Sequence, residues 1–473
     1  MKSFPAAVLA CLLFISCQPA RDENDFTLPV PNPTPSSSNT HIIGLVGTLS
    51  GPDSWRGDDA FKGADLAVHE LNRELEANET QFELVTLDDR GDADRATDLV
   101  KELASSDRAV GIVYAGPPEG LPPAERSLSR MGVPAIICHG DLYGARLLSP
   151  HVFQTSPSFL WQSRRIVDYL LGDRGYRRIG LASEISLTGR TARKNLAVAL
   201  EEEGAGLAGS VTYRPEDLDG ARIVDALRRR RVQAVVIQAS PPSALKIQRS
   251  LRLNGARYRN TRAARASSRA TKAWVPQVVG FDQTMSAALE PVDLPAGTIA
   301  SDSYDRGVHY LPIPNFARFR QAFRNWWDRE PLGWERRSYD AVHMIGWAID
   351  EAGIKEARPD RDLAPVLEKM DGTRFGGLGI TLGPDDHTTV EQSTVGLWVV
   401  PRLGISVPEL GLVPNSMPWV PLARGFSIDG ERTDIQPQDW KWLFENAPPK
   451  KAPAPRLSRA RFGVTTSSRD PIH

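Results

Sequence analysis

The chain has 473 residues, which is more than a single hydrophobic core usually supports, so we expect two packed lobes and additional segments. Lys and Arg together number 57 and Asp and Glu 58, which leaves a formal net charge of −1. This balance disfavours a dedicated nucleic-acid partner, because such a partner requires many contacts between basic side chains and phosphates.

Residues 1–17 have the pattern of a secretory signal peptide. Lys2 supplies a positive charge, and the apolar run from Ala6 to Ile15 is too short to span a bilayer. The run leads into Ser16-Cys17, which resembles a bacterial lipobox, where a small residue precedes the cysteine that receives lipid. We therefore expect lipidation of Cys17 and an extracytoplasmic protein anchored to a membrane. An unmodified cysteine at this position and a competing lipobox at Cys11 are the alternatives.

Two polar segments flank the body of the chain. Residues 18–40 are rich in Pro, Ser and Asn, as in a flexible linker, and residues 446–473 have the composition of a disordered tail. Of the three cysteines only Cys138 lies between these segments, so we expect no internal disulfide.

From His41 onward, short apolar runs alternate with segments of helical periodicity, which predicts parallel sheets covered by helices. A first series of strands is followed by a second one, and each series predicts one doubly wound lobe. A helical region at 316–353 and a late strand at 393–400 complete the body. The expected strands are 42–49, 82–87, 109–114 and 133–137 in the first lobe, and 179–182, 232–237 and 275–281 in the second.

Open parallel sheets bind ligands at the carboxyl ends of their strands, so two such sheets facing one another predict a cleft that holds the functional site. Residues 256–273 carry a basic run without an acidic residue, in a position between a helix and a strand. We interpret this run as a solvated surface insertion, with contact to anionic lipid or to a partner as the alternative.

The segment Gly47-Thr48-Leu49-Ser50-Gly51-Pro52, followed by Gly57 and by Phe61 to Val68, resembles the opening of the branched-chain amino-acid (Leu/Ile/Val) binding protein family. These are periplasmic type I solute-binding proteins of ABC transporters. Further resemblances are spread in order along the chain, at 87–96, 111–113, 132–134, 153–158, 278–282, 339–342 and 377–384. Matching segments that occur in the same order along much of a chain are typical of a shared fold.

The resemblance implies an α/β fold of two doubly wound parallel-sheet lobes, joined by a three-segment hinge that closes on a solute. The crossings would lie near Phe153, 297–304 and 394–400. The expected N-terminal lobe comprises 41–153 plus 298–393, and the C-terminal lobe 154–297 plus 394–445. Closure on a small polar solute would let the protein dock on an ABC permease.

The resemblance places Ser50, Gly51, Trp55 and Arg56 in a loop that lines the cleft. Asp282 matches the acid that pairs with the ligand ammonium in amino-acid-binding members, and a charge-assisted bond suits it. A surface role for Arg56 and a helix N-cap for Asp282 are the alternatives.

Two loops depart from the family pattern. Where amino-acid-binding members present hydroxyl groups, this chain has Gly116-Pro117-Pro118-Glu119-Gly120 and His139-Gly140-Asp141. Glu119, His139 and Asp141 are therefore expected to contact the ligand, and the two acids would repel a carboxylate. On this ground a cationic or neutral polar solute is favoured over a plain α-amino acid.

An enzyme is disfavoured, because the sequence has no metal-spaced His pair, no Gly-x-Ser-x-Gly and no phosphate-binding glycine motif. We expect neither a cofactor nor a metal. The alternative to uptake is a regulatory lipoprotein of the same fold, which would activate a cell-wall synthase or sense a ligand for a signalling receptor.

Overall fold

The computed structural model describes residues 40–74, 81–141, 149–260, 274, 276–282, 299–303, 314–331, 334–354, 362–377, 379–390, 395–399 and 420–421. All of them belong to one compact unit that starts at Pro35. The expected signal peptide with Cys17, the linker, residues 261–273 of the basic run, and the tail lie outside these residues. Among the helices of the described part, none is both long enough and apolar enough to cross a membrane.

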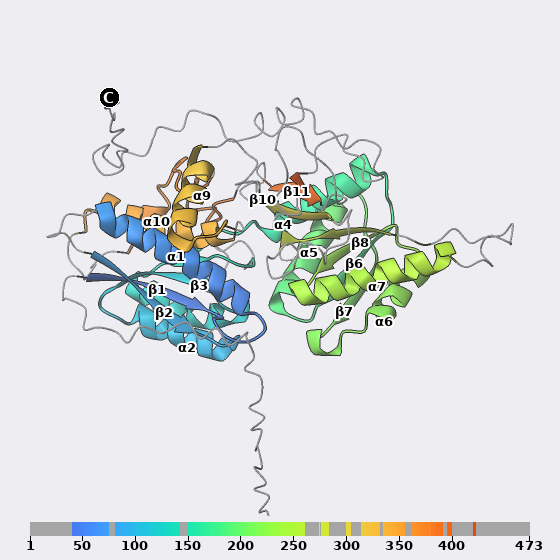
Figure 1. Cartoon of the computed structure of the whole chain (residues 1–473), viewed down its shortest axis with the longest axis horizontal. Helices are drawn as coiled ribbons and strands as arrows, with labels where there is room; N and C mark the ends of the chain where they lie inside the picture. The colour runs from blue at the N-terminus through green and yellow to red at the C-terminus, as the bar shows by residue number, and fades with distance from the viewer. Residues whose placement is uncertain are drawn as a thin grey trace, which may run out of the picture. The chain divides into compact units, whose positions relative to one another are not determined.

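The first sheet contains five parallel strands in the order β2-β1-β3-β4-β5 (Figure 1). Every residue of β1, β3, β4 and β5 is buried, which explains their continuous apolar runs, since both faces of a parallel sheet are covered. The strands are β1 (Thr40–Gly47), β2 (Gln81–Asp88), β3 (Ala109–Ala115), β4 (Ala135–Ile137) and β5 (Val152–Gln154).

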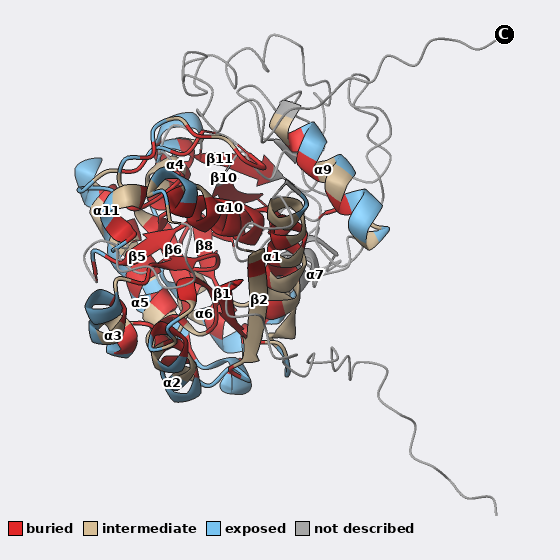
Figure 2. Cartoon of the chain, turned by 90° about the vertical axis from the view of Figure 1, so that its left-hand side faces the viewer, coloured by how far each residue is buried: buried red, intermediate tan, exposed pale blue. Residues whose placement is uncertain are grey.

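Helices cover both faces of this sheet, and we call the assembly the first lobe. Ile43 and Leu45 of β1 share an apolar cluster with α1 and α10, whereas Ile42 and Val46 share one with α2 and α3. Figure 2 shows the buried strands between helices that are exposed on their outer sides. The helices are α1 (Ser54–Glu74), α2 (Ala93–Ala104), α3 (Glu125–Met131), α9 (Pro314–Trp327), α10 (Glu335–Glu351) and the short α11 (Ala364–Leu367).

The second sheet, with its helices the second lobe, has the order β12-β11-β10-β9-β8-β6-β7. Its strands are parallel except that β10 and β12 each pair antiparallel with β11. The strands are β6 (Ile179–Glu184), β7 (Leu207–Tyr213), β8 (Ala234–Gln238), β9 (Gln277–Gly280), β10 (Ile299–Ser303), β11 (Val395–Val399) and β12 (Val420–Pro421). The helices are α4 (Phe159–Val167), α5 (Leu187–Glu202), α6 (Gly220–Arg229) and α7 (Pro241–Asn260).

The predicted fold class is confirmed, with local differences. Strands β5, β7, β10 and β12 were not predicted. The sequence of β7, Leu207-Ala-Gly-Ser-Val-Thr-Tyr213, mixes polar and apolar residues at an exposed sheet edge. The helical region at 316–353 is two helices, and Asp328 with a φ of 51° follows the first of them. The first part of the basic run continues α7 to Asn260.

One boundary needs correction. The second segment of the expected N-terminal lobe began at 298, but β10 pairs with β9 and β11 and so lies in the second sheet. The chain therefore returns to the first lobe after Ser303. The other lobe boundaries stay a prediction.

The two lobes are in direct contact. Ala300 of β10 and Trp398 of β11 belong to the apolar cluster that contains α1 and α10 of the first lobe. The end of β5 also pairs with the segment that leads to β11: Gln154 N donates to His387 O (3.0 Å) and Thr389 N donates to Gln154 O (2.9 Å). One stretch that the resemblance assigns to the hinge, near Phe153, thus lies beside residues 387–389.

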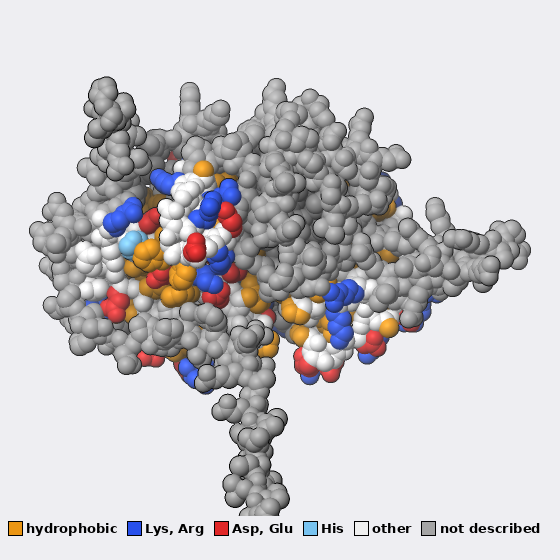
Figure 3. Space-filling model, in the orientation of Figure 1, with side chains coloured by type: hydrophobic (Ala, Val, Ile, Leu, Met, Phe, Trp, Pro, Cys, Tyr) orange, Lys and Arg blue, Asp and Glu red, His pale blue; other side chains and the backbone are white. Residues whose placement is uncertain are grey.

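Basic and acidic side chains are interspersed among apolar ones over α1 and α9, on the face shown in Figure 3. Several of them form ion pairs, such as Arg320 with Glu330 at 2.7 Å. This part of the surface therefore carries no extended patch of one sign.

Candidate functional site

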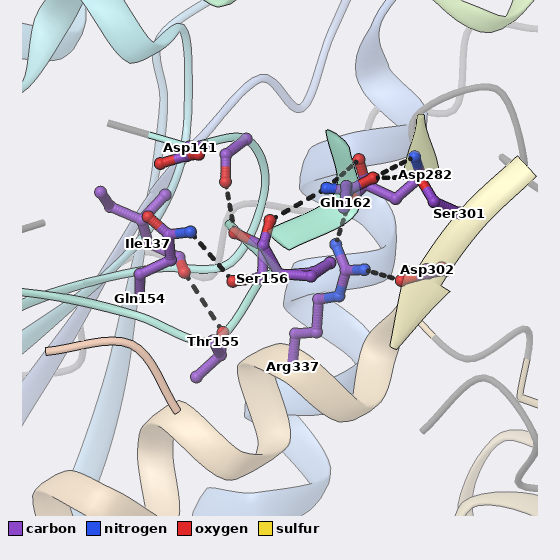
Figure 4. A network of polar contacts seen from close by, with 12 residues as sticks. Ile137, Asp141, Gln154, Thr155, Ser156, Gln162, Asp282, Ser301, Asp302 and Arg337 are labelled. Atoms are coloured by element: carbon purple, nitrogen blue, oxygen red, sulfur yellow. Dashed lines mark hydrogen bonds and ion pairs between the residues drawn. The ribbon is translucent and has the colours of Figure 1, made fainter. Parts of the chain in front are cut away.

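Side chains from the carboxyl ends of strands in both sheets meet at one place. From the first sheet come the start of α1 after β1, the turn after β3 and the residues after β4. From the second come Asp282 after β9 and Asp302 in β10. Arg337, at the start of α10, points toward Asp282 and Asp302 (Figure 4). This is the location that parallel-sheet architecture predicts for a ligand site.

The loop after β1 is built by hydrogen bonds to the end of β2. The Asp88 carboxylate accepts from Ser50 Oγ (2.7 Å) and from Leu49 N (2.9 Å). Burial raises the pKa of Asp88, but these and other hydrogen bonds outweigh burial, so the net effect lowers the pKa. Gly51 adopts a left-handed φ of +85°, which glycine tolerates. In this structure Ser50 and Gly51 shape the loop that leads into α1.

The next feature is an aromatic cluster formed by Trp55, His139 and Trp334. The rings of His139 and Trp334 stack with centroids 4.8 Å apart, and the Trp55 ring lies edge-on to both, at 5.8 and 5.2 Å. Trp334 is 1% exposed and His139 4%, while Trp55 is half-buried. The cluster therefore joins α1, β4 and the residue that precedes α10.

Two arginines flank the aromatic cluster. The Arg56 guanidinium lies 5.3 Å from the Trp55 ring centroid, and that of Arg337 lies 4.5 Å from Trp334. Burial, together with the charges of Arg337 and Arg56, holds the pKa of His139 well below its usual value, so the ring is neutral. The indole N–H groups of Trp55 and Trp334 are buried and have no hydrogen-bond partner among the described residues.

The side chain of Arg337, a residue of the first lobe, forms ion pairs with two acids of the second lobe. Its Nη1 donates to Asp282 Oδ2 (3.1 Å) and its Nη2 to Asp302 Oδ1 (2.7 Å), as Figure 4 shows. Gln162 completes the network, since its Nε2 donates to Asp282 Oδ1 (3.3 Å) and its Oε1 accepts from Asp282 N (2.9 Å) and Ser301 Oγ (2.8 Å). All five residues are buried.

The charge balance of this network perturbs Asp282. Burial is the largest cause, and the negative charge of Asp302 adds to it, while Arg337 and Gln162 oppose them; the net effect raises the pKa of Asp282 to about 6. Burial away from water is the main reason for incomplete ionisation, and the second carboxylate adds to it. Asp282 thus lies at the place that the resemblance suggests, with its carboxylate bound to an arginine of the chain itself.

Glu119 and Asp141 contact helix N-termini. Glu119 Oε1 accepts from Leu187 N (2.7 Å) at the start of α5, and Asp141 Oδ2 accepts a short hydrogen bond from Phe159 N at the start of α4. Both are bonds from the first lobe to the second, and a carboxylate is stabilised at a helix N-terminus. Backbone N–H groups thus already engage both acids, which removes one reason to expect a cationic solute.

Sequence reasoning missed Trp334, Arg337, Asp302 and Gln162. One signal was present: Arg336 and Arg337 stand in the first turn of a helix, where the macrodipole disfavours cations. Such a pair requires acidic partners, and Asp340 and Asp282 supply them. In the described part of the chain, no three His, Cys, Asp or Glu side chains are placed to hold a metal ion.

Comparisons with known proteins agree with this architecture. The family model described as "Periplasmic binding protein" matches residues 41–399. No curated protein matches the chain significantly in sequence. Among solved structures, a type 1 periplasmic binding protein from Bordetella pertussis Tohama I is similar, with 19% identity and a TM-score of 0.64, over 78% of this chain and 98% of that one.

Two further structures are named with their ligands. The branched-chain amino-acid transporter substrate-binding protein LivJ from Streptococcus pneumoniae, in complex with isoleucine, has 19% identity and a TM-score of 0.60 over 81% of this chain and all of that one. A solute-binding protein of an ABC transporter from R. palustris, in complex with 4-hydroxybenzoate, has 18% identity and a TM-score of 0.62 over 77% and 94%. With the family model spanning both sheets, the chain belongs to the periplasmic binding protein family.

Proposed function

We propose that this chain is the solute-binding lipoprotein of an ABC uptake system and that it holds a small solute between its lobes by hinge closure. The observation that carries the proposal is the convergence of buried side chains from the strand ends of both sheets on the aromatic cluster and Arg337. A site shared by two lobes gives a solute differential affinity for the closed state, which is the requirement for ligand-driven closure.

The similar structures support uptake as the class of function. LivJ binds isoleucine and the R. palustris protein binds 4-hydroxybenzoate. The first ligand has an ammonium group and the second has none. The solute of this chain must therefore be inferred from its own residues.

Isothermal titration of the full-length protein in mild detergent tests solute binding, with amino acids, aromatic acids, amides, polyamines and sugars as the panel. Closure is followed by energy transfer between dyes on Met131→Cys in the first lobe and Glu216→Cys in the second, both of which are exposed. Cys138 is buried and does not compete for the dyes, and Cys11→Ala and Cys17→Ala remove the other two thiols from the dye-labelled protein. We expect one class of solute to bind and to raise the transfer efficiency. Absence of any binding across the panel would contradict the proposal.

The lipid anchor is tested separately. Metabolic labelling with a fatty acid is expected to mark the wild-type protein and the Cys11→Ala variant, and to be lost in Cys17→Ala. Labelling that survives Cys17→Ala would contradict anchoring through this residue.

A regulatory lipoprotein is the second candidate, and one observation favours it. Arg337 bonds to Asp282 and Asp302 across the lobes, so the chain itself supplies a cation that joins them. A protein held closed in this way would present its surface to a partner without a solute. Neighbouring permease and ATPase genes would favour uptake, and a neighbouring synthase or kinase gene would favour regulation.

A further inference from the structure

We propose that Arg337 is a built-in occupant of the cation subsite formed by Asp282 and Asp302, and that the chain in consequence binds a planar carboxylate without an ammonium group. This inference rests on the proposed uptake function and names its class of solute. It assigns to Arg337 the part of a specificity-determining residue.

Both acids are engaged by groups of the chain. Each acid accepts from a different nitrogen of the Arg337 guanidinium, and Asp282 also accepts from Gln162. Asp282, Asp302 and Arg337 are each at most 2% exposed. An ammonium group could reach these acids only by displacing the guanidinium, which would leave a buried cation unpaired, a strongly unfavourable change. A free amine on the solute is therefore selected against.

The Arg337 guanidinium is also held in place by Trp334. It lies over the face of Trp334, 4.5 Å from the ring centroid, and Trp334 in turn stacks on His139. A planar cation fixed between two acids and an indole has lost most of its rotamers before any solute arrives. Arg337 is thus a fixed part of the site wall.

Around the aromatic cluster the site offers donors without acceptors. The indole N–H groups of Trp55 and Trp334 have no partner among the described residues, and no described acid forms an ion pair with Arg56. Two donors without partners and a nearby cation favour an acceptor with negative charge, and the half-buried Trp55 ring favours a flat, apolar body. A planar carboxylate combines these features.

A matched pair of probes tests the inference: 3-phenylpropionate and phenylalanine, which share a carboxylate and a phenyl ring and differ by the ammonium group. Benzoate and 4-hydroxybenzoate extend the carboxylate series. By titration calorimetry on the full-length wild-type protein, we expect an aromatic carboxylate without an amine to bind at least about tenfold more tightly than phenylalanine, as expected for one lost charged hydrogen bond.

Variants test separately the exclusion of an ammonium group by Arg337 and the binding of a carboxylate near Arg56. Arg337→Met vacates the acid pair and is expected to reverse the preference, so that phenylalanine and 2-phenylethylamine gain affinity. Arg337→Lys keeps a cation there and should retain the wild-type preference, which makes it the matched control. Arg56→Met should lower the affinity for carboxylates about tenfold, and phenylalanine should still bind more weakly than 3-phenylpropionate. If Arg337→Met does not fold, Arg337→Gln is used, since it also removes the guanidinium from the acid pair.

The outcomes are distinct. Wild-type protein that binds phenylalanine as tightly as 3-phenylpropionate overturns the inference, and so does an unchanged preference in a folded Arg337→Met variant. Binding of a sugar or polyamine in place of any carboxylate also overturns it, while uptake as a function stands. No binding by any class of solute removes the proposed function itself.

Discussion

Arg336 and Arg337 are neighbours in sequence with different roles in the structure. Both are buried in the first turn of α10, where the helix dipole disfavours positive charge. Arg336 pairs with Asp340 within the same helix, whereas Arg337 pairs across the lobes with Asp282 and Asp302. One arginine therefore stabilises the local helix, and the other links two sheets.

The raised pKa of Asp282 gives a prediction about pH. Because its pKa rises from 3.8 to about 6 on folding, the native state binds more protons than the unfolded state between these values, and the free energy of unfolding falls as pH rises through this window. Asp282→Asn removes this group. Relative to wild type, we expect the variant to gain up to about 3 kcal/mol between pH 4 and pH 7, from about two pKa units.

Urea denaturation of both proteins at several pH values provides the measurement. The sign matters, since an acid with a lowered pKa would give the opposite slope. Parallel pH profiles of wild type and Asp282→Asn would show that Asp282 titrates alike in the folded and unfolded states.

Trp334 gives a second prediction at the same scale. Its ring is 1% exposed and contacts His139, Trp55 and Arg337, so truncation leaves a large cavity. We expect Trp334→Ala to lower the free energy of unfolding by about 4 kcal/mol, and Trp334→Phe, which keeps an aromatic ring, by less. Equal losses in the two variants, measured by urea denaturation, would contradict a role for the ring in packing.

Helix N-termini hold the lobes together at the scale of elements. Glu119 of the first lobe accepts from the first residue of α5, and Asp141 from the first residue of α4. The helix α5 already has a cap in its own lobe, because Ser186 Oγ accepts from Gly189 N (3.0 Å). Glu119 therefore adds an interlobe bond to a helix that is stable without it.

Glu119→Ala is accordingly expected to favour an open arrangement of the lobes while each lobe stays folded. The expected readout is lower energy transfer between dyes on Met131→Cys and Glu216→Cys, with an unchanged circular dichroism spectrum. Ser186→Ala is the control, since it should cost about 1 kcal/mol of stability and leave the transfer unchanged. A Glu119→Ala variant with the wild-type transfer efficiency would contradict the interlobe role.

The crossing of α1 and α10 depends on a glycine. A Cβ at Gly63 would lie 1.8 Å from Glu335 O, so no side chain fits there without moving α10. We expect Gly63→Ala to destabilise the protein by about 3 kcal/mol through overpacking, as measured by thermal unfolding. Gly206→Ala serves as the control, because its Cβ would meet no atom within 4 Å. A Gly63→Ala variant with the stability of the wild type would contradict this, because it would show that α1 and α10 can move apart at no cost.

At the scale of the whole molecule, the lobes share an interface in addition to the chain crossings. Ala300 and Trp398 of the second sheet pack in the first lobe's apolar cluster, and Arg337, Glu119 and Asp141 each bond across. These contacts would have to part for a solute to enter the aromatic cluster. We expect solute entry to be slow for this reason, with a rate that increases in Glu119→Ala; stopped-flow tryptophan fluorescence would measure it.

Much of this architecture was determined by the sequence itself. The alternation of apolar runs with helical periodicity predicted most of the first sheet and four strands of the second, and the ordered family resemblance predicted the fold, because these signals are local along the chain. Trp55, His139 and Asp282 were placed at strand ends for the same reason, and the structure brings them to one region.

Only the tertiary structure decided what these residues contact. Asp282 read equally well as a helix cap or as a partner for an ammonium group, and its actual partner is Arg337, 55 residues away in the chain. Glu119 and Asp141 read as open acids, yet backbone N–H groups of the other lobe engage them. The charge of a side chain is fixed by its type, but the partner that neutralises it depends on how the two sheets meet, and no local pattern encodes that contact.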